Sequence, residues 1–171
     1  MNIHKLLSAR VRNIKVNPFV EDLREHNSFL QSRINDKRIL VIGGAGTIGS
    51  SYIKQILQYK PSKITVVDIN ENGLTELTRD LRSSSLLDYN PVYITYPVNL
   101  LSTTFDKIFK SETWDVVSNF AAHKHVRSEK DVISVEALIK NNVFGAIKLL
   151  KLCEGKPPNY FFSVSTDKAA N

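Results

Sequence analysis

The chain has very little cysteine and no long apolar run. Its 171 residues include a single cysteine, Cys153, which excludes a disulfide within the chain. Cys153 lies in an apolar helical pattern, so a buried and unreactive thiol is expected. No apolar run approaches the ~20 residues that cross a bilayer, and no signal-peptide core lies near the N-terminus. We therefore expect a cytoplasmic protein with no transmembrane segment.

Neither composition nor charge is extreme. The hydrophobic content of 42% and the charged content of 23% are ordinary for a soluble globular protein, and the length fits one domain with a sizeable core. The net charge of +6 is compatible with a phosphate-bearing ligand, although solvated lysines alone produce the same value. We expect no nucleic-acid partner, and no internal repeat is present.

Residues 1–36 are expected to form a helical arm that stands apart from the rest of the chain. The segment 1–15 has basic but no acidic residues, its apolar residues recur at helical spacing, and a second amphipathic stretch follows Pro18. Base rates for amphipathic helices favour an arm packed on its own domain or on a partner. A membrane-surface helix is the alternative for the basic first part.

From Lys37 onwards, apolar strand patterns alternate with helical patterns. The expected strands are 39–42, 63–68, 90–95, 114–120 and 160–165, and the expected helices are 47–59, 71–84, 103–111 and 132–154. Such alternation predicts βαβ units with right-handed crossovers, and hence a doubly wound parallel sheet of order 3-2-1-4-5. We expect residues 37–171 to form this single α/β domain, which ends just past the fifth strand.

A glycine-rich turn joins the first strand to the first helix of this domain. In a dinucleotide site one glycine makes the turn, one lets the backbone approach a pyrophosphate, and one lets helix and strand pack closely. The phosphates would lie on the free N–H groups at the helix N-terminus. A merely structural turn is the alternative. The cofactor-binding residues predicted here are Gly43, Gly44, Ala45, Gly46, Thr47, Ile48 and Gly49.

An acidic residue, Asp68, ends the second strand 19 residues after Gly49. An acid at this position accepts hydrogen bonds from the adenosine ribose hydroxyls and repels a 2′-phosphate, so the pattern favours NAD over NADP. The prediction assigns Asp68, Ile69 and Asn70 to the cofactor site. A turn or helix-cap aspartate is the alternative interpretation.

Two further segments follow strands at the same edge of the sheet. Strands one and four are neighbours in the expected order, and ligands bind in the crevice outside their carboxyl ends. That places Ala121 and Ala122 against the glycine turn, where small side chains let a cofactor lie on the backbone; tight packing is the other interpretation. Asn99 and Leu100, after the third strand, are expected beside the adenine.

The segment Ser165-Thr166-Asp167-Lys168 closes the fifth strand at this edge. A hydroxyl, a carboxylate and an amine together can polarise a carbonyl, donate a proton and accept one. Ser, Thr and Asp are also the preferred residues of helix N-caps, and residue types alone favour neither interpretation. His123 and His125 could be two metal ligands, but no third ligand is obvious nearby, so we expect no metal site.

Four segments together resemble a known family. They are 43–49 (Gly-Gly-Ala-Gly-Thr-Ile-Gly), 121–126 (Ala-Ala-His-Lys-His-Val), 139–143 (Ile-Lys-Asn-Asn-Val) and 165–171 (Ser-Thr-Asp-Lys-Ala-Ala-Asn). From about Asp36 onwards the chain resembles the extended short-chain dehydrogenase/reductase superfamily. Within it, the chain is similar to the UDP-N-acetylglucosamine 4,6-dehydratases and nucleotide-sugar epimerases of bacterial polysaccharide biosynthesis. The resemblance implies a Rossmann fold, a tightly held NAD(P) and a nucleotide-sugar substrate, most simply a UDP-sugar.

The resemblance also implies roles for individual residues. In that family hydride leaves C4 of the sugar, the C5 proton and a C6 hydroxyl are lost as water, and in a dehydratase the hydride returns to C6. By position, Thr166 would help to hold the C4 hydroxyl, and Asp167 and Lys168 would serve acid/base roles in the elimination. The resemblance adds Lys124, Asn142 and Ser165 to the cofactor site, with Asn142 as a supporting residue.

The chain departs from the family pattern in three places. Asn99 stands where the family usually has Asp, and Arg127 where it commonly has Pro. The Tyr-x-x-x-Lys element, whose Tyr can be Met, is expected after Asn171, together with the substrate-binding lobe. We therefore expect the cofactor-binding half of a longer enzyme, inactive alone. The alternatives are a nucleotide-sugar reductase or dehydrogenase and a non-catalytic dinucleotide-binding module.

This expected end of the chain has a consequence for the sheet. Strand five carries Tyr160, Phe161 and Phe162 and would lack a sixth-strand neighbour, which makes it an exposed apolar edge. We expect a homo-oligomer, formed through this edge or through the N-terminal arm.

Overall fold

The computed structural model of the chain describes residues 18–123 and 131–164. Contacts between Cα atoms divide the chain into two units, residues 1–33 and 34–171. In the described ranges, no helix is both long enough and apolar enough to span a bilayer.

The described part of the first unit is helical, as the sequence predicts. It contains α2 (Pro18–Glu25) and α3 (Asn27–Ile34), which are separate helices rather than one amphipathic stretch. Val20 and Phe29 are exposed on these helices. The basic segment 1–15, for which the sequence predicts a helix, lies outside the described residues.

The second unit alternates strands with helices. The strands are β1 (Arg38–Ile42), β2 (Lys63–Asp68), β3 (Val92–Pro97), β4 (Val116–Asn119) and β5 (Tyr160–Ser163). The helices between the first four strands are α4 (Thr47–Leu57), α5 (Glu71–Ser83) and α6 (Thr103–Lys110). The largest difference from the predicted strand boundaries is in β3, which begins at Val92 rather than at Asn90. Asn90 adopts a φ of +56°, and the hydrogen bonding to the neighbouring strand starts with Val92 N–H, which donates to Ser62 O just before β2 (2.9 Å).

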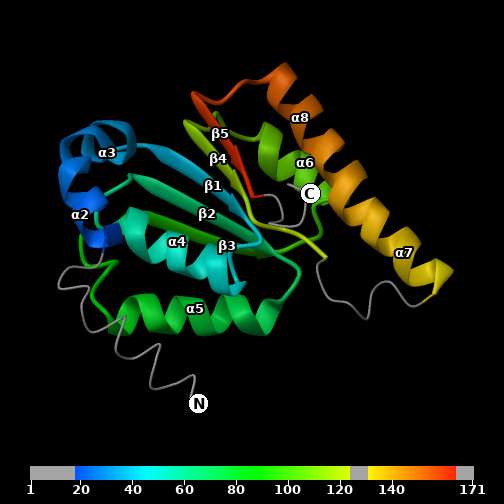
Figure 1. Cartoon of the computed structure of the whole chain (residues 1–171), viewed down its shortest axis with the longest axis horizontal. Coiled ribbons are helices and arrows are strands. Elements are labelled where there is room, and N and C mark those ends of the chain that lie inside the picture. Colours follow the sequence, from blue (N-terminus) through cyan, green and yellow to red (C-terminus); the bar gives the residue numbers. More distant parts are fainter. Residues whose placement is uncertain (1–17, 124–130, 165–171) are drawn as a thin grey trace, which may run out of the picture. The chain divides into compact units, whose positions relative to one another are not determined.

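All five strands are parallel and lie in the order β3-β2-β1-β4-β5 (Figure 1). This confirms the predicted Rossmann-type sheet. In register, Ile39 of β1 lies opposite Ile64 of β2 and Val116 of β4, and Val116 lies opposite Tyr160 of β5. The carboxyl ends of β1, β4 and β5 therefore meet at one edge, where parallel sheets of this kind bind ligands.

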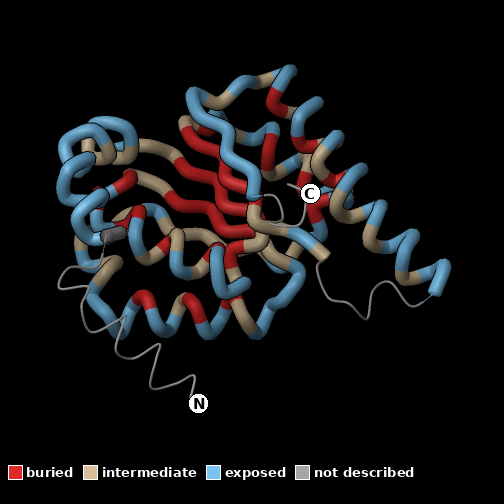
Figure 2. The backbone as a smooth tube through the Cα atoms, viewed as in Figure 1, coloured by how far each residue is buried: buried red, intermediate tan, exposed pale blue. Residues whose placement is uncertain are grey.

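Helices cover both faces of the sheet (Figure 1). On one face Ile39 and Val41 pack with α4 and α5, and on the other Leu40 and Ile42 pack with α6 and α8 (Gly145–Gly155). Successive side chains of a strand point to opposite faces, so β1 is buried on both sides and reads as a continuous apolar run. Figure 2 shows the buried residues concentrated in the central strands, whereas β5 is exposed along its whole length.

The connection before β5, predicted as one helix over 132–154, is helical throughout but not uniformly. It consists of α7 (Val132–Ile139), a π-helical turn η2 (Lys140–Phe144) and α8. Asp131 caps its start, with Oδ1 accepting from Ser134 N–H at 2.9 Å. Ile139, Val143 and Ile147 keep a spacing of four across the π turn, so the periodicity of the sequence does not reveal it.

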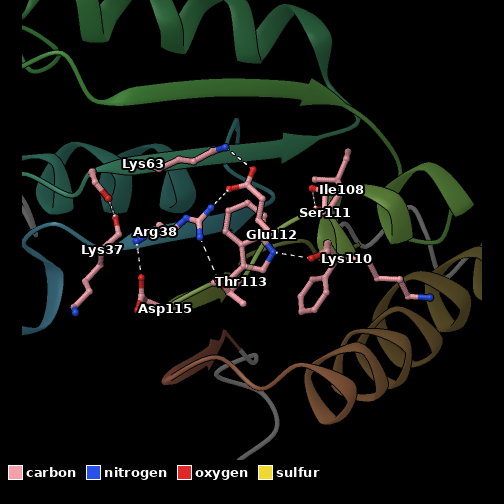
Figure 3. Close-up of polar contacts among 12 residues, drawn as sticks. Lys37, Arg38, Lys63, Ile108, Lys110, Ser111, Glu112, Thr113 and Asp115 are labelled. Atoms are coloured by element: carbon pink, nitrogen blue, oxygen red, sulfur yellow. Dashed lines mark hydrogen bonds and ion pairs between the residues drawn. The ribbon is translucent and has the colours of Figure 1, made fainter.

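The amino-terminal edge of the sheet is held by ionic contacts of Glu112, which precedes β4 (Figure 3). Its carboxylate accepts from Arg38 Nη2 at 2.8 Å and pairs with Lys63, and thereby ties β1 and β2 to the end of α6. Partial burial acts to raise the pKa of Glu112, but the hydrogen bonds and charges of Lys63 and Arg38 outweigh it and hold the pKa below its ordinary value. This edge is structural and lies opposite the ligand-binding edge.

The single cysteine behaves as the sequence predicts. Cys153 lies in α8 and is buried in the core on the α6 side of the sheet. Burial raises the pKa of its thiol, which disfavours the reactive thiolate.

Candidate functional site

The glycine turn joins β1 to α4 and is pressed against the end of β4. Gly43 has a φ of +74°, and a Cβ atom there would lie 2.5 Å from Ala121 N. A Cβ atom at Gly49 would lie 2.4 Å from Gly43 O, and one at Gly44 would lie 2.3 Å from Val66 Cγ1. The protein's own packing therefore requires glycine at these three positions.

Gly46 differs from the other three glycines. Its φ of −73° is ordinary, and the nearest atom to a Cβ built there would be Gly43 O at 3.5 Å. An alanine would fit without moving any neighbour. Packing gives no reason for glycine here, whereas the close approach of a ligand to the backbone would.

The start of α4 also differs from the starts of α5, α6 and α7. Those helices are capped by the side chains of Asn70, Ser102 and Asp131 respectively. Gly46 is the N-cap of α4 and offers no side chain, and no described residue accepts from the N–H groups of Thr47 and Ile48. Free N–H groups at the positive end of a helix dipole suit an anion.

Asp68 holds the glycine turn from the end of β2. Its Oδ2 accepts from Ala45 N–H and its Oδ1 from Asn70 N–H, both at 2.9 Å. These two bonds match the alternative interpretation from the sequence, in which Asp68 is a turn or helix-cap aspartate. Each carboxylate oxygen has a second lone pair, which leaves capacity for ribose hydroxyls. Ile69, beside it, is two-thirds exposed (66%).

The remaining residues assigned to the adenosine end have different surroundings. Asn70 caps α5 by accepting from Gly73 N–H at 3.0 Å. Asn99 closes the turn after β3, with Oδ1 accepting from Leu101 N–H at 2.7 Å. The Leu100 side chain is buried in the core on the α6 side, although the sequence placed this residue beside the adenine. Of these three residues, Asn70 and Asn99 have polar side chains and Leu100 does not.

The end of β4 is organised by Asn119, which sequence reasoning missed. Its buried side chain accepts from Ala121 N–H at 3.1 Å and donates to Ser163 Oγ of β5 at 3.2 Å. It thereby fixes the turn that meets Gly43 and ties it to the end of the neighbouring strand. The signal was an amide at the end of a strand that begins with two valines. Ala122, one residue further, is exposed.

Asn142 clamps the backbone that follows β4. It lies in η2, where its Oδ1 accepts from His123 N–H and its Nδ2 donates to His123 O, both at 2.8 Å. Asn141 donates to the same Oδ1 at 3.1 Å. The π turn thus carries the amide that holds the chain at the ligand-binding edge, and π turns are frequent at functional sites. The supporting role that the resemblance implied for Asn142 stays a prediction.

Several predicted site residues lie outside the described ranges. These are Lys124, Ser165, Thr166, Asp167 and Lys168. The described chain leads up to the last four through Val164, whose N–H donates to Asn119 O at 3.0 Å. Within the described ranges, no group of three or more His, Cys, Asp and Glu residues could hold a metal ion.

Comparisons with known proteins bear on this arrangement. The model of a family described as polysaccharide biosynthesis protein matches residues 39–171. An uncharacterized membrane protein of Methanocaldococcus jannaschii is 35% identical over 136 residues, which are 80% of this chain and 38% of that protein. The UDP-N-acetylglucosamine 4,6-dehydratase (inverting) of Campylobacter jejuni is 29% identical over 138 residues, again 80% of this chain and 38% of the relative.

Solved structures share the fold. The enzyme WbmF of Bordetella bronchiseptica, determined in complex with NAD+ and UDP, superposes with a TM-score of 0.58 at 18% identity. That match covers 77% of this chain and 36% of WbmF. The chain thus spans less than two-fifths of the length of each of these proteins. By its sequence match over 39–171, the chain belongs to the polysaccharide biosynthesis protein family, whose relatives include nucleotide-sugar 4,6-dehydratases.

Proposed function

We propose that the glycine turn binds the pyrophosphate of NAD, and that the chain is the cofactor-binding part of a nucleotide-sugar 4,6-dehydratase. The observation that carries the proposal is the uncapped start of α4 at Gly46. Free N–H groups, an open glycine backbone and a positive helix end together fit a pyrophosphate. Their position at the carboxyl ends of β1 and β4 is where this fold binds dinucleotides.

The preference for NAD over NADP is assigned to Asp68. Its carboxylate is fixed by Ala45 and Asn70, so it keeps its position when a ligand arrives. A negative group held there would accept from ribose hydroxyls and repel a 2′-phosphate.

The chemistry of the sugar is assigned to the segment after β5. When bound, NAD would take a hydride from the sugar and return it. Thr166 would hold the sugar hydroxyl at C4, and Asp167 and Lys168 would move protons as water leaves. The pairing of β5 with β4 supports this, because it brings the chain entering Ser165 to the edge where Ala121 meets the glycine turn.

A UDP-linked N-acetylhexosamine is the proposed substrate. Its support is the name of the Campylobacter relative and the UDP in the Bordetella structure. Because the matched part spans less than two-fifths of those proteins, the proposal for this chain by itself is cofactor binding, with turnover assigned to the longer enzyme.

The test is NAD binding by the purified chain and its Gly46→Ala variant, measured by calorimetric titration. Gly46→Ala adds one methyl group that makes only an ordinary 3.5 Å contact with Gly43 O, so the unfolding midpoint should not change. NAD affinity should fall at least tenfold (~1.4 kcal/mol), because the methyl group meets the phosphate. Gly155→Ala is the matched control, since a Cβ atom there meets nothing within 4 Å and Gly155 lies away from the glycine turn. The proposal fails if the wild-type chain does not bind NAD, or if Gly46→Ala binds NAD as tightly as Gly155→Ala does.

A further inference from the structure

The end of β4 holds two neighbouring elements through three consecutive side chains. Ser118 donates from its Oγ to the Tyr52 hydroxyl of α4 at 2.9 Å. Asn119 points to the opposite face of the sheet, where its side chain donates to β5. The Phe120 ring packs against the rings of Tyr52 and Phe162, with centroids 5.0 Å and 5.8 Å away. Because β4 lies between β1 and β5 (Figure 1), its end joins the helix after the glycine turn to the strand that leads toward the sugar-chemistry segment.

The orientation of the Asn119 side-chain amide is fixed by its two partners. A backbone N–H can only donate, so the atom that faces Ala121 N–H at 3.1 Å is the amide oxygen. The amide nitrogen therefore faces Ser163 Oγ, at 3.2 Å. Asn119 is buried, with only 6% of its surface exposed, and Ser163 is its register partner on β5. These two bonds, the Asn119 bridge, connect the turn after β4 to the end of β5.

Both ends of the Asn119 bridge lead to the ligand-binding edge. On one side, Ala121 N lies against the glycine turn, since a Cβ atom at Gly43 would be only 2.5 Å from it. On the other side, Val164 N–H donates to Asn119 O at 3.0 Å, and the segment 165–168 begins at the next position. A displacement of either end therefore changes the position of the other through one buried residue.

The Asn119 bridge is costly to break on one side alone. Loss of the Ser163 oxygen would leave the buried Asn119 Nδ2 without the acceptor that it has in the structure. A buried donor that loses its acceptor costs more than the intact bond contributes. The amide lowers this cost by turning toward the exposed β5 edge, and its oxygen then leaves Ala121 N–H. A change in β5 thus loosens the turn beside Gly43.

We propose that Asn119 and Ser163 are positioning residues that set the end of β5 relative to a cofactor bound at the glycine turn. The inference rests on the proposed function, in which the cofactor lies over Ala121 and the sugar chemistry follows Val164. The Asn119 bridge would hold the groups that move protons in register with the cofactor. Such a constraint is worth having because a misplacement of about 1 Å between reacting groups can cost ~100-fold in rate.

The test compares NAD binding by variants of the 171-residue chain in calorimetric titrations. Ser163→Ala removes the acceptor and should weaken NAD binding about fivefold, which corresponds to one hydrogen bond (~1 kcal/mol). Ser163→Thr keeps the hydroxyl oxygen and suits a strand, so it should bind NAD as the wild type does. Ser83→Ala is the matched control, because the hydroxyl that it removes donates to Asp80 O within α5, away from the bridge.

Hydrogen exchange of a backbone amide supplies a readout that a merely structural role would not change. Linkage between two equilibria is reciprocal, so a bridge that strengthens NAD binding is itself strengthened by NAD through the same factor. Saturating NAD should therefore slow exchange of Val164 N–H about fivefold in the wild type. In Ser163→Ala, where the bridge is absent, NAD should slow it by less than about twofold.

Three results would overturn the proposal: equal NAD affinity of the wild type and Ser163→Ala, equal loss in Ser163→Ala and Ser163→Thr, or no effect of NAD on Val164 exchange. Failure of the wild-type chain to bind NAD would instead overturn the proposed function. The Asn119 bridge is then tested without ligand, since Ala121 N–H should exchange faster in Ser163→Ala than in Ser163→Thr. Equal exchange rates would show that the bridge does not hold the turn.

Discussion

Two parts of the sheet differ in how completely their own chain covers them. In β1, every residue after Arg38 is buried, whereas all four residues of β5 are exposed. Helices α4 and α5 close over β1 and β2, while α7 leaves Val132 and Ile133 exposed to 84% and 79%. The covered part contains the glycine turn. The difference shows that the end with the glycine turn is packed by neighbouring βαβ units, whereas the β5 end presents exposed apolar side chains.

The covered part should be the more sensitive to added volume. Gly49→Ala forces a Cβ atom to within 2.4 Å of Gly43 O, a backbone atom that cannot rotate away, and should lower the free energy of unfolding by about 3 kcal/mol. The measurement is urea unfolding followed by circular dichroism. Gly155→Ala is again the control and should change the free energy of unfolding by less than about 1 kcal/mol. Equal stabilities of the two variants would remove the distinction between the two parts.

Asn142 connects the two parts, because it lies in η2 and holds His123 after β4. Asn142→Ala removes two hydrogen bonds to one backbone and should cost about 2 kcal/mol, at about 1 kcal/mol each. Hydrogen exchange of the His123 amide should accelerate with it. Asn141→Ala, which loses one bond to the Asn142 side chain, should cost less. If the His123 amide is protected equally in both variants, the clamp does not connect the two parts.

The exposed part should govern self-association. Phe161→Lys places a charge on the β5 edge and should weaken any self-association at least tenfold (~1.4 kcal/mol) with little change in unfolding, because charged side chains block edge-to-edge pairing. Sedimentation velocity across a concentration series measures this. Val92→Lys puts the same charge on β3, at the other edge of the sheet, where the side chain is half exposed. An equal effect of both variants would show that β5 has no special role.

The smallest effect is expected at Glu112. The pKa of this carboxyl is lowered in the folded protein, so its contribution is present above the ordinary value of 4.5 and is lost as the pH falls through the lowered pKa. Glu112→Gln should cost about 1 kcal/mol at pH 7. Unfolding midpoints of the two proteins should converge as the pH is lowered below 4.5. A difference that stays constant down to pH 3 would show that the ion pairs with Arg38 and Lys63 contribute nothing.

The sequence predicted the sheet because its signals are local. Apolar runs, helical spacing and the glycine turn each depend on residues close in the chain, and the crossover rule then gives the strand order. The expected position of Ala121 against the glycine turn followed from that order, and the structure places Ala121 N beside Gly43. The family assignment drawn from the motifs is also confirmed.

What the sequence could not predict depends on contacts between distant residues. Asn119 and Ser163 are 44 positions apart, and Asn142 and His123 are 19 apart, and neither pair has a local pattern. The burial of the Leu100 side chain could not be predicted for the same reason, because its core partners come from α6 and α8. The start of β3 was missed because Asn90 adopts a left-handed backbone conformation that residue type permits without requiring.

The π turn η2 also sets the rotational phase between the two helices that it joins. One extra residue in a helix rotates everything on one side by about 100° relative to the other. Deleting a residue between Lys140 and Phe144 would restore a regular pitch, yet it would swing α7 around its axis and carry Asn142 away from His123. Length changes of a whole turn would preserve the phase of this helix, whereas a change of one residue would not.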